Sequence, residues 1–232
     1  MQVQLREVTV VVDGVSDKSK RETLRASCIR AYSALAAELP RLATERTGKV
    51  NLLLRAATDD LPVDSSHVDE SINSVMTIEE TVDIDALLRL SADERAVHLL
   101  DRLRDTLRSL ALKHAWDIDR IHNAYRLAVE GGVTARLRRP QKLHSSKKFA
   151  AEAEGQIDEE GMHISLRIVS PADGATTLCR ATQVERGDWY RLLDGLAGVT
   201  WQGEVATVVR KRGKERYFLP PLTLTLTDDQ QR

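Results

Sequence analysis

Residues 91–132 read SADERAVHLLDRLRDTLRSLALKHAWDIDRIHNAYRLAVEGG, and their periodicity predicts a helical hairpin. Ser91, followed three residues later by Glu94, forms a capping box, in which each side chain accepts a free backbone N–H of the other. Asp117 predicts the cap of a second helix, which ends at Gly131–Gly132. Apolar residues at three- and four-residue steps predict one buried stripe on the first helix: Ala96, Leu99, Leu100, Leu103, Leu107, Leu110 and Ala111. The charged residues between them predict a solvent face with Asp–Arg pairs at helical spacing.

The residues before this hairpin predict a β-α-β unit. Val3 and Leu5 alternate with polar residues in one phase and residues 8–12 in the other, so we expect a bulged first strand. A helix follows from Ser16 or Asp17 to about Leu39, where we expect Pro40 to kink or stop it. A short buried strand is predicted at 50–54, a loop at 58–71, a strand at 75–82 and a short helix capped by Asp83 and running to Leu88.

After Gly132 the period changes to two, which predicts strands joined by tight turns and hence an antiparallel sheet. We expect strands at 133–137, 149–154, 162–168, 175–184 and 222–226, one alternation from 199 to 209 with odd-numbered residues inward, and a short helix at 188–196. The predicted fold class is α+β: an N-terminal β-α-β unit, a central helical hairpin and a C-terminal, mainly antiparallel sheet with one short helix. This is either a single domain, 1–232, or two subdomains, 1–132 and 133–232.

Composition limits the function classes. With 42% hydrophobic residues, 30% charged residues and a net charge of −1, the chain resembles a globular protein without a global field for nucleic acid or anionic membranes. Two cysteines are too few for a disulfide framework. No segment has the apolar length of a membrane span, and the N-terminus lacks a signal-peptide pattern, so we expect a cytoplasmic protein with no membrane partner.

The segment 56–88 carries nine acidic residues and no Lys or Arg. A solvated loop, a surface for a basic protein partner and a metal site all fit this composition, although no spacing matches a calcium loop. The candidate partner-binding residues are Asp59, Asp60, Asp64, Asp69 and Glu70.

Two basic runs lie in the second half, around residues 136–148 and 210–216. Basic hairpins contact phosphates, but Lys and Arg at strand edges also keep sheets from pairing. The candidate anion-binding residues are Arg136, Arg138, Arg139, Lys211, Arg212 and Lys214.

Catalytic and cofactor signatures are weak. His114, Asp117, Asp119 and His122 include possible metal ligands, but they cross a helix junction without a metal-binding spacing, so we assign no metal and no cofactor. Cys28 lies on an apolar helical stripe, where a thiol acts as a small hydrophobe. No nucleophile elbow, P-loop or dinucleotide fingerprint occurs.

The sequence therefore favours a non-enzymatic bacterial protein-binding protein, whose most concrete form is an immunity protein that neutralises a toxin through an acidic surface. The alternatives are a nucleic-acid-associated accessory protein using the basic hairpins and an enzyme whose site is assembled from distant residues. The sequence leaves the partner's identity and the oligomeric state open.

Overall fold

The computed structural model describes residues 3–5, 7–58, 62–64, 66–69, 74–158, 161–170, 177–185, 195–210 and 221–226. The chain forms two compact units, 1–135 and 136–232. Helices and mixed sheet build the first unit, and antiparallel sheets build the second. The α+β fold class predicted from the sequence is confirmed.

The first unit is organised around a four-stranded sheet in the order β2-β4-β6-β5. Strands β2, β4 and β6 are parallel, and β5 pairs antiparallel with β6 at one edge. A separate antiparallel pair joins β1 to β3. The strands are β1 (Val3–Leu5), β2 (Glu7–Asp13), β3 (Leu42–Thr44), β4 (Lys49–Ala56), β5 (Ser66–Asp69) and β6 (Val75–Val82); the helices are α1 (Lys18–Glu38), α2 (Ile84–Arg89), α3 (Ala92–His114) and α4 (Ile118–Glu130).

Local signals define the helix ends. The Asp17 side chain caps α1, which ends just before Pro40. The predicted capping box at the start of α3 is present, with Ser91 and Glu94 bonding each other's backbone N–H groups. Ala115 then adopts a left-handed conformation with φ of 53°, and Asp117 caps α4. These caps set the turn of the predicted helical hairpin.

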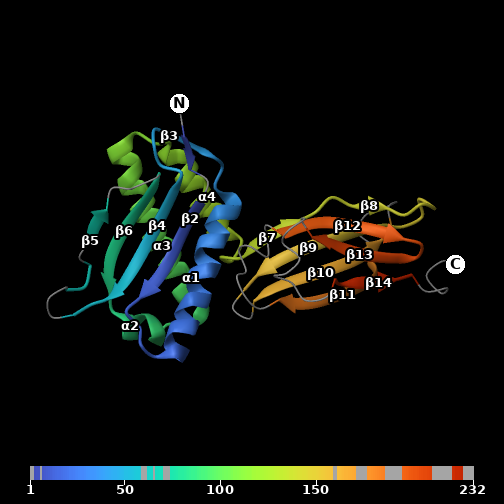
Figure 1. The fold of residues 1–232 in the computed structure, drawn as a ribbon, viewed down its shortest axis with the longest axis horizontal. Helices are drawn as coiled ribbons and strands as arrows, with labels where there is room; N and C mark the ends of the chain where they lie inside the picture. The colour runs from blue at the N-terminus through green and yellow to red at the C-terminus, as the bar shows by residue number, and fades with distance from the viewer. Residues whose placement is uncertain are drawn as a thin grey trace. The chain divides into compact units, whose positions relative to one another are not determined.

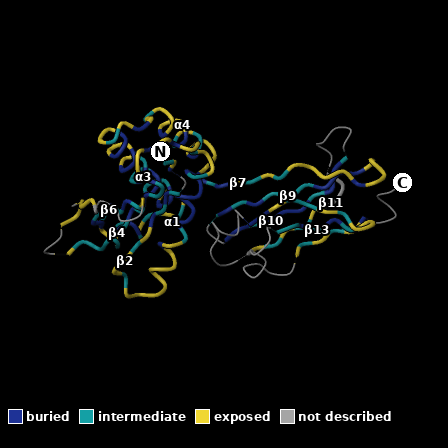
Figure 2. Tube along the Cα trace, turned by 45° about the horizontal axis from the view of Figure 1, so that its top comes forward, coloured by how far each residue is buried: buried dark blue, intermediate teal, exposed yellow. Residues whose placement is uncertain are grey.

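One face of the sheet is buried under helices. Its apolar residues are Val8, Val10, Val50, Leu52, Leu54, Met76 and Ile78, all from alternate positions of the three parallel strands. In Figure 1 these strands lie in front of α3, and Figure 2 marks the outer turns of α4 as exposed. The opposite face carries cross-strand polar pairs, among them Lys49–Glu7 at 2.7 Å and Arg55–Glu79 at 3.1 Å.

Two buried arginines join the helices by donating to backbone carbonyls. Arg95 of α3 donates to the carbonyl oxygens of Leu87 and Leu90 at 3.0 and 2.8 Å, and to the Ser27 hydroxyl of α1 at 3.2 Å. Arg30 of α1 reaches the end of α4, where it donates to the Val133 carbonyl at 3.0 Å. Directional bonds between elements therefore fix the helix layer.

The second unit contains two antiparallel sheets. Strands β11, β10, β9 and β7 form one in that order, with β8 also paired to β9, and β12, β13 and β14 form the other. Within this unit β12 lies next to β9, and β14 lies next to β10 and β11. The strands are β7 (Ala135–Arg138), β8 (Lys142–Leu143), β9 (Ala150–Ile157), β10 (Met162–Val169), β11 (Thr177–Glu185), β12 (Leu196–Gln202), β13 (Val205–Arg210) and β14 (Thr223–Thr225).

The buried face of the larger sheet pairs small residues with large ones. Along β9 and β10, Gly155 lies opposite Ile164 and Ala153 lies opposite Leu166. All four residues are buried. A large side chain opposite a small one fills the space over both strands. Packing in this unit therefore depends on complementary side-chain sizes across the strand pair.

Several element predictions were wrong in detail. The predicted bulged first strand is two strands in different sheets, and the predicted loop at 58–71 contains β5. The alternation predicted at 199–209 is a hairpin of β12 and β13, which turns at Gly203 with a φ of 56°. On β13 the buried side chains are Ala206 and Val208, and not the odd-numbered residues as predicted. A one-residue turn shift reverses which side chains face inward. The helix predicted at 188–196 lies almost wholly outside the described residues.

Candidate protein-binding site

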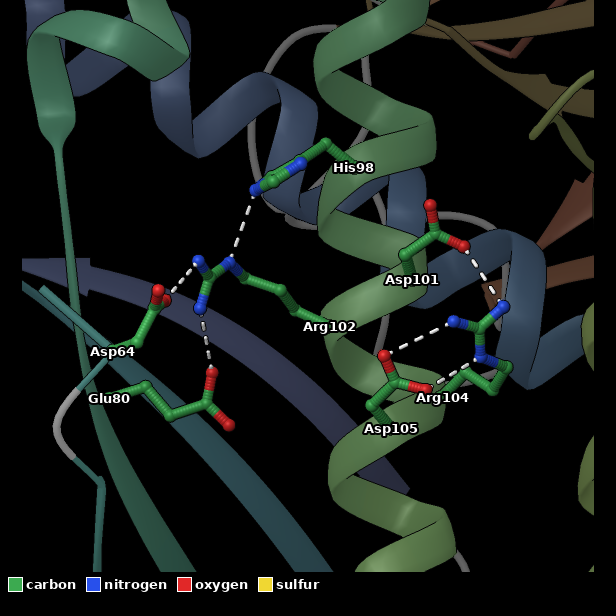
Figure 3. Close-up of a pocket in the computed structure, with 7 residues that line it drawn as sticks. All are labelled: Asp64, Glu80, His98, Asp101, Arg102, Arg104 and Asp105. Atoms are coloured by element: carbon green, nitrogen blue, oxygen red, sulfur yellow. Dashed lines mark hydrogen bonds and ion pairs between the residues drawn. The ribbon is translucent and has the colours of Figure 1, made fainter.

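A pocket of about 460 Å³ lies beside α3 in the first unit (Figure 3). Seven residues line it: Asp64, Glu80, His98, Asp101, Arg102, Arg104 and Asp105. Five of them come from α3, Glu80 comes from β6 and Asp64 lies just before β5. Every lining residue is charged or titratable, so the pocket favours charged groups.

Arg102 joins three parts of the first unit. Its Nη2 lies 2.8 Å from Asp64, its Nη1 lies 3.2 Å from Glu80, and its Nε donates to Nε2 of His98 at 3.1 Å. Glu80 also accepts the Thr106 hydroxyl at 2.8 Å. The guanidinium plane therefore fixes one turn of α3 against both β6 and the residues that precede β5.

Arg104 forms a second charged group on the same helix. It donates twice to Asp105, at 2.9 and 3.1 Å, lies 3.2 Å from Asp101, and sits 4.4 Å from the centre of the Tyr125 ring. Tyr125 donates its hydroxyl to Asp101 at 2.5 Å. The hydrogen bond to Asp105 raises the pKa of Arg104, while burial and the Asp101 hydrogen bond raise the pKa of Tyr125. Asp101 and Asp105 are thus held in place by a cation that stacks on an aromatic ring.

Three of the four carboxylates of the pocket are more exposed than its two guanidinium groups, whereas the fourth, Glu80, is less exposed than either, at 17%. The exposed side-chain fractions are 71% for Asp64, 60% for Asp105 and 38% for Asp101, against 20% for Arg102 and 27% for Arg104. A molecule that approaches the pocket therefore meets carboxylate oxygens first.

His98 is half-buried at the edge of the pocket, where its surroundings favour the neutral imidazole. Burial lowers its pKa below 6.5, and the neighbouring Arg102 lowers the pKa further. Because Nε2 accepts a hydrogen bond from Arg102, the ring proton lies on Nδ1. This imidazole acts as an acceptor for the guanidinium.

The structure brings one predicted acidic residue, Asp64, into this pocket. The backbone of Asp69 lies on β5, opposite Thr77 of β6. Asp59, Asp60 and Glu70 lie outside the described residues. The α3 members of the pocket were not predicted as site residues. Their helical spacing predicts a solvent face, and the contacts of Arg102 with Asp64 and Glu80, which build the pocket, are long-range.

The predicted anion-binding residues that are described lie in the second unit. Arg136 is exposed. Arg138 forms an ion pair with Glu154 at 3.4 Å, and the Nε of Arg139 donates to the Leu196 carbonyl at 2.7 Å. Lys211, Arg212 and Lys214 lie outside the described residues.

The second unit also has a pocket, of about 160 Å³, on the polar face of its larger sheet. His163 bonds Asp158 at 2.8 Å, and Arg180 donates to the Ser165 hydroxyl at 3.0 Å. These groups bond one another across adjacent strands, which explains the pocket as a paired polar sheet face.

The other chemical candidates have structural explanations. The Cys28 thiol is fully enclosed, and burial raises its pKa to about 12. His114 stacks on Trp116 with ring centres 5.8 Å apart. Within the described part of the chain, no three His, Cys, Asp or Glu side chains converge as a metal site requires, and no helix is long and apolar enough to cross a bilayer.

Comparison with known proteins adds no relative: no protein-family model, no curated protein and no solved structure matches this chain.

Proposed function

We propose that the chain is a non-enzymatic protein-binding protein whose α3 pocket receives basic side chains of a protein partner. In its most concrete form it is an immunity protein that covers a toxin's active site, with carboxylates in the position of a polyanionic substrate. The observation that carries this proposal is the layering of the pocket, in which Asp64, Asp101 and Asp105 lie outward over two less exposed arginines.

This layering favours binding for an entropic reason. A free surface carboxylate loses rotamer freedom when a partner fixes it, and this loss weakens association. Asp101 and Asp105 are already fixed by Arg104, and Asp64 is already fixed by Arg102. A partner's Lys or Arg can therefore bind oxygens that are in place before the encounter.

Electrostatic complementarity gives the proposal its specificity. Complementary charges steer encounter and discriminate against wrong partners, and their effect falls as salt screens them. Replacing the three aspartates by asparagine would leave Arg102 and Arg104 without these partners, so the pocket would change from outwardly acidic to basic. A basic partner should then be repelled.

The experiment compares capture by the tagged full-length chain with capture by the Asp64→Asn, Asp101→Asn, Asp105→Asn triple variant. A partner recovered from cells that produce the chain is purified, and its affinity is measured at two salt concentrations. We expect the affinity of the triple variant to fall by about tenfold or more, because each carboxylate–cation pair raises the association rate and lowers the dissociation rate. If the partner is a toxin, the wild-type chain should also inhibit its activity.

The matched control is the Glu22→Gln, Asp119→Asn, Glu130→Gln variant, which removes the same charge from exposed positions of the first unit outside the pocket. It should bind within about twofold of wild type, since distant rim charges contribute little. Wild-type affinity in the pocket variant, with its fold verified by circular dichroism, would refute the proposal.

A further inference from the structure

We infer that the second unit carries a binding site for single-stranded nucleic acid, formed by Lys142, Lys147, Lys148 and Trp201. These four residues, the lysine tip, lie on β8, on the turn between β8 and β9, and on β12, which is next to β8. The lysines contact the phosphates of a strand, and a base stacks on Trp201. The site belongs to one unit and does not depend on the proposed protein partner.

A buried histidine joins the two turns around the lysine tip. Nε2 of His144 lies 3.2 Å from the Gly203 carbonyl, in the turn between β12 and β13, and donates to it because a carbonyl only accepts. Nδ1 accepts the backbone N–H of Ser146 at 3.3 Å, in the turn between β8 and β9. His144 is only 7% exposed. The backbone of the lysine tip is therefore ordered before a ligand arrives, which lowers the entropic cost of binding.

The charges of the three lysines are not neutralised by neighbours. In the described part of the chain, none of them lies within ion-pair distance of a carboxylate, and all three are exposed. In the first unit, by contrast, Lys20 and Lys49 lie 2.8 and 2.7 Å from carboxylates. Lysines also protect strand edges from pairing, but Lys147 and Lys148 lie in a turn and not on a strand. Their positive charge is therefore free to contact phosphates.

One carboxylate opposes these lysines. Glu204 lies in the neighbouring turn, with its carboxylate 3.8 Å from Nε2 of His144. Three lysines against this one carboxylate leave the lysine tip basic, although the whole chain has a net charge of −1. The local balance decides binding, because in physiological salt exposed charges interact over about 8 Å.

Trp201 adds an aromatic surface to the lysine tip. Its side chain is half-exposed, and its Nε1 donates to the Lys142 carbonyl at 2.9 Å. The His144 ring packs against it edge to face, with ring centres 4.9 Å apart. Nε1 is the only polar atom of an indole, so the exposed part of Trp201 is carbon surface, on which a base can stack.

The same hydrogen bond favours nucleic acid over an anionic membrane. A tryptophan at a membrane interface keeps its N–H in the wet headgroup region, whereas the N–H of Trp201 is bonded to the protein. Leu143 beside it is 53% exposed, but one leucine supplies little apolar surface for insertion into lipid. A single strand requires only positive charge and a stacking surface.

The experiment mixes the full-length chain with labelled oligothymidylate or oligouridylate of about 20 nucleotides and measures binding by fluorescence anisotropy. We expect the affinity to fall about twentyfold between about 50 and about 200 mM salt, as three phosphate contacts require. Tighter binding of one strand would assign DNA or RNA as the preferred ligand. No binding of either strand at about 50 mM salt would overturn the inference. Binding of phosphatidylserine vesicles alone would overturn it in favour of a membrane.

Charge removal locates the site. The Lys142→Gln, Lys147→Gln, Lys148→Gln variant should bind about tenfold or more weakly at low salt, with a flatter salt dependence. The matched control removes the same charge from exposed positions of the first unit, and it should bind within about twofold of wild type. Its substitutions are Lys18→Gln, Lys20→Gln and Lys113→Gln. Wild-type affinity in the lysine-tip variant, with its fold verified by circular dichroism, would overturn the inference.

Two further changes have effects that a purely structural role would not produce. Glu204→Gln should raise the affinity about twofold, because it removes the charge that repels phosphate. Trp201→Phe and Trp201→Leu both lose the bond to Lys142, but only Phe keeps an aromatic ring. Phe should bind within about threefold of wild type and Leu about tenfold more weakly. Equal affinities of the Phe and Leu variants would overturn the stacking role of Trp201.

Discussion

The two units of this chain stabilise their sheets in different ways. In the first unit, helices cover one face of a mixed sheet, and buried guanidiniums join helix to helix through backbone carbonyls. In the second, small residues on β9 match large residues on β10, and two antiparallel sheets lie together. The packing of the first unit depends on hydrogen bonds between its helices, and the packing of the second depends on complementary side-chain sizes across neighbouring strands.

This difference predicts how each unit responds to substitution. Loss of a buried donor removes hydrogen bonds from several carbonyl oxygens at once, and the cost falls on every element it joined. Loss of a buried apolar side chain leaves a cavity, whose cost depends on how far its surroundings can relax.

The largest expected effect is on the reactivity of the buried Cys28 thiol. Slow modification of this thiol shows that the helices exclude solvent from it. In a Cys179→Ser background, a thiolate-selective reagent should modify Cys28 about a thousandfold more slowly in the native protein than in urea at the same pH. The reason is that burial raises the pKa of Cys28 from 9.0 to about 12. Native and unfolded rates within tenfold of each other would show that the helix layer is open.

The next largest effect should come from Arg95, which tests the role of directional bonds. Arg95→Ala should lower the free energy of unfolding by about 4 kcal/mol, because the Leu87 and Leu90 carbonyls and the Ser27 hydroxyl lose a buried donor. Chemical denaturation of the full chain measures this change.

Arg95→Met separates bonding from packing, since it restores the apolar stem without the donors. It should remain nearly as unstable as Arg95→Ala, whereas rescue by Met would assign the effect to packing. Arg89→Ala is the control, because the exposed Arg89–Asp83 pair at 4.0 Å contributes less than about 1 kcal/mol.

Leu166 tests the dependence of the second unit on shape. Leu166→Ala should cost about 3 kcal/mol, because it places two alanines opposite each other at a fully buried position. Hydrogen exchange of the β9 and β10 amides should report the loss. Val184→Ala, at a partly exposed position on β11, should stay within about 0.5 kcal/mol of wild type, and an equal cost at both positions would contradict the packing argument.

The smallest effect should come from the capping box, which acts within a single helix. Ser91→Ala should destabilise the first unit by about 1 kcal/mol, because the Glu94 backbone N–H loses its acceptor. Thermal unfolding followed by circular dichroism detects this change. Ser109→Ala, on the exposed side of the same helix, should be neutral or slightly stabilising, since alanine is the better helix former.

His98 contributes to the pH dependence of the first unit's stability in the mildly acidic range. Its pKa is lowered by folding, so the unfolded chain binds the proton more readily. The contribution of the neutral imidazole is therefore fully present above a pH of about 6.5 and declines as the pH falls toward the lowered pKa.

Features decided within a few residues were predictable from the sequence. The capping box needs only Ser91 and Glu94, and the end of α1 needs only Pro40. Strand β5 was missed because its four residues are ordered by pairing with β6 and not by their own pattern. The sequence pattern predicts the wrong inward face for β13, because the alternation of 199–209 continues across Gly203, where the chain turns.

The pocket was predictable only in part, for the same physical reason. The acidity of the segment that contains Asp64 was visible in the sequence. The pocket itself requires contacts between residues 64, 80 and 102, and the tertiary fold alone brings these together.

The bonds from Arg95 to the end of α2 also bear on the order of folding. A helix of six residues is too short to persist by itself in water. The Leu87 carbonyl of α2 and the carbonyl of its C-cap, Leu90, both accept from Arg95 of the following helix, so docking of α3 stabilises the end of α2. The chain should therefore fold its long capped helix early and complete the shorter helix before it in sequence afterwards, against the order of synthesis.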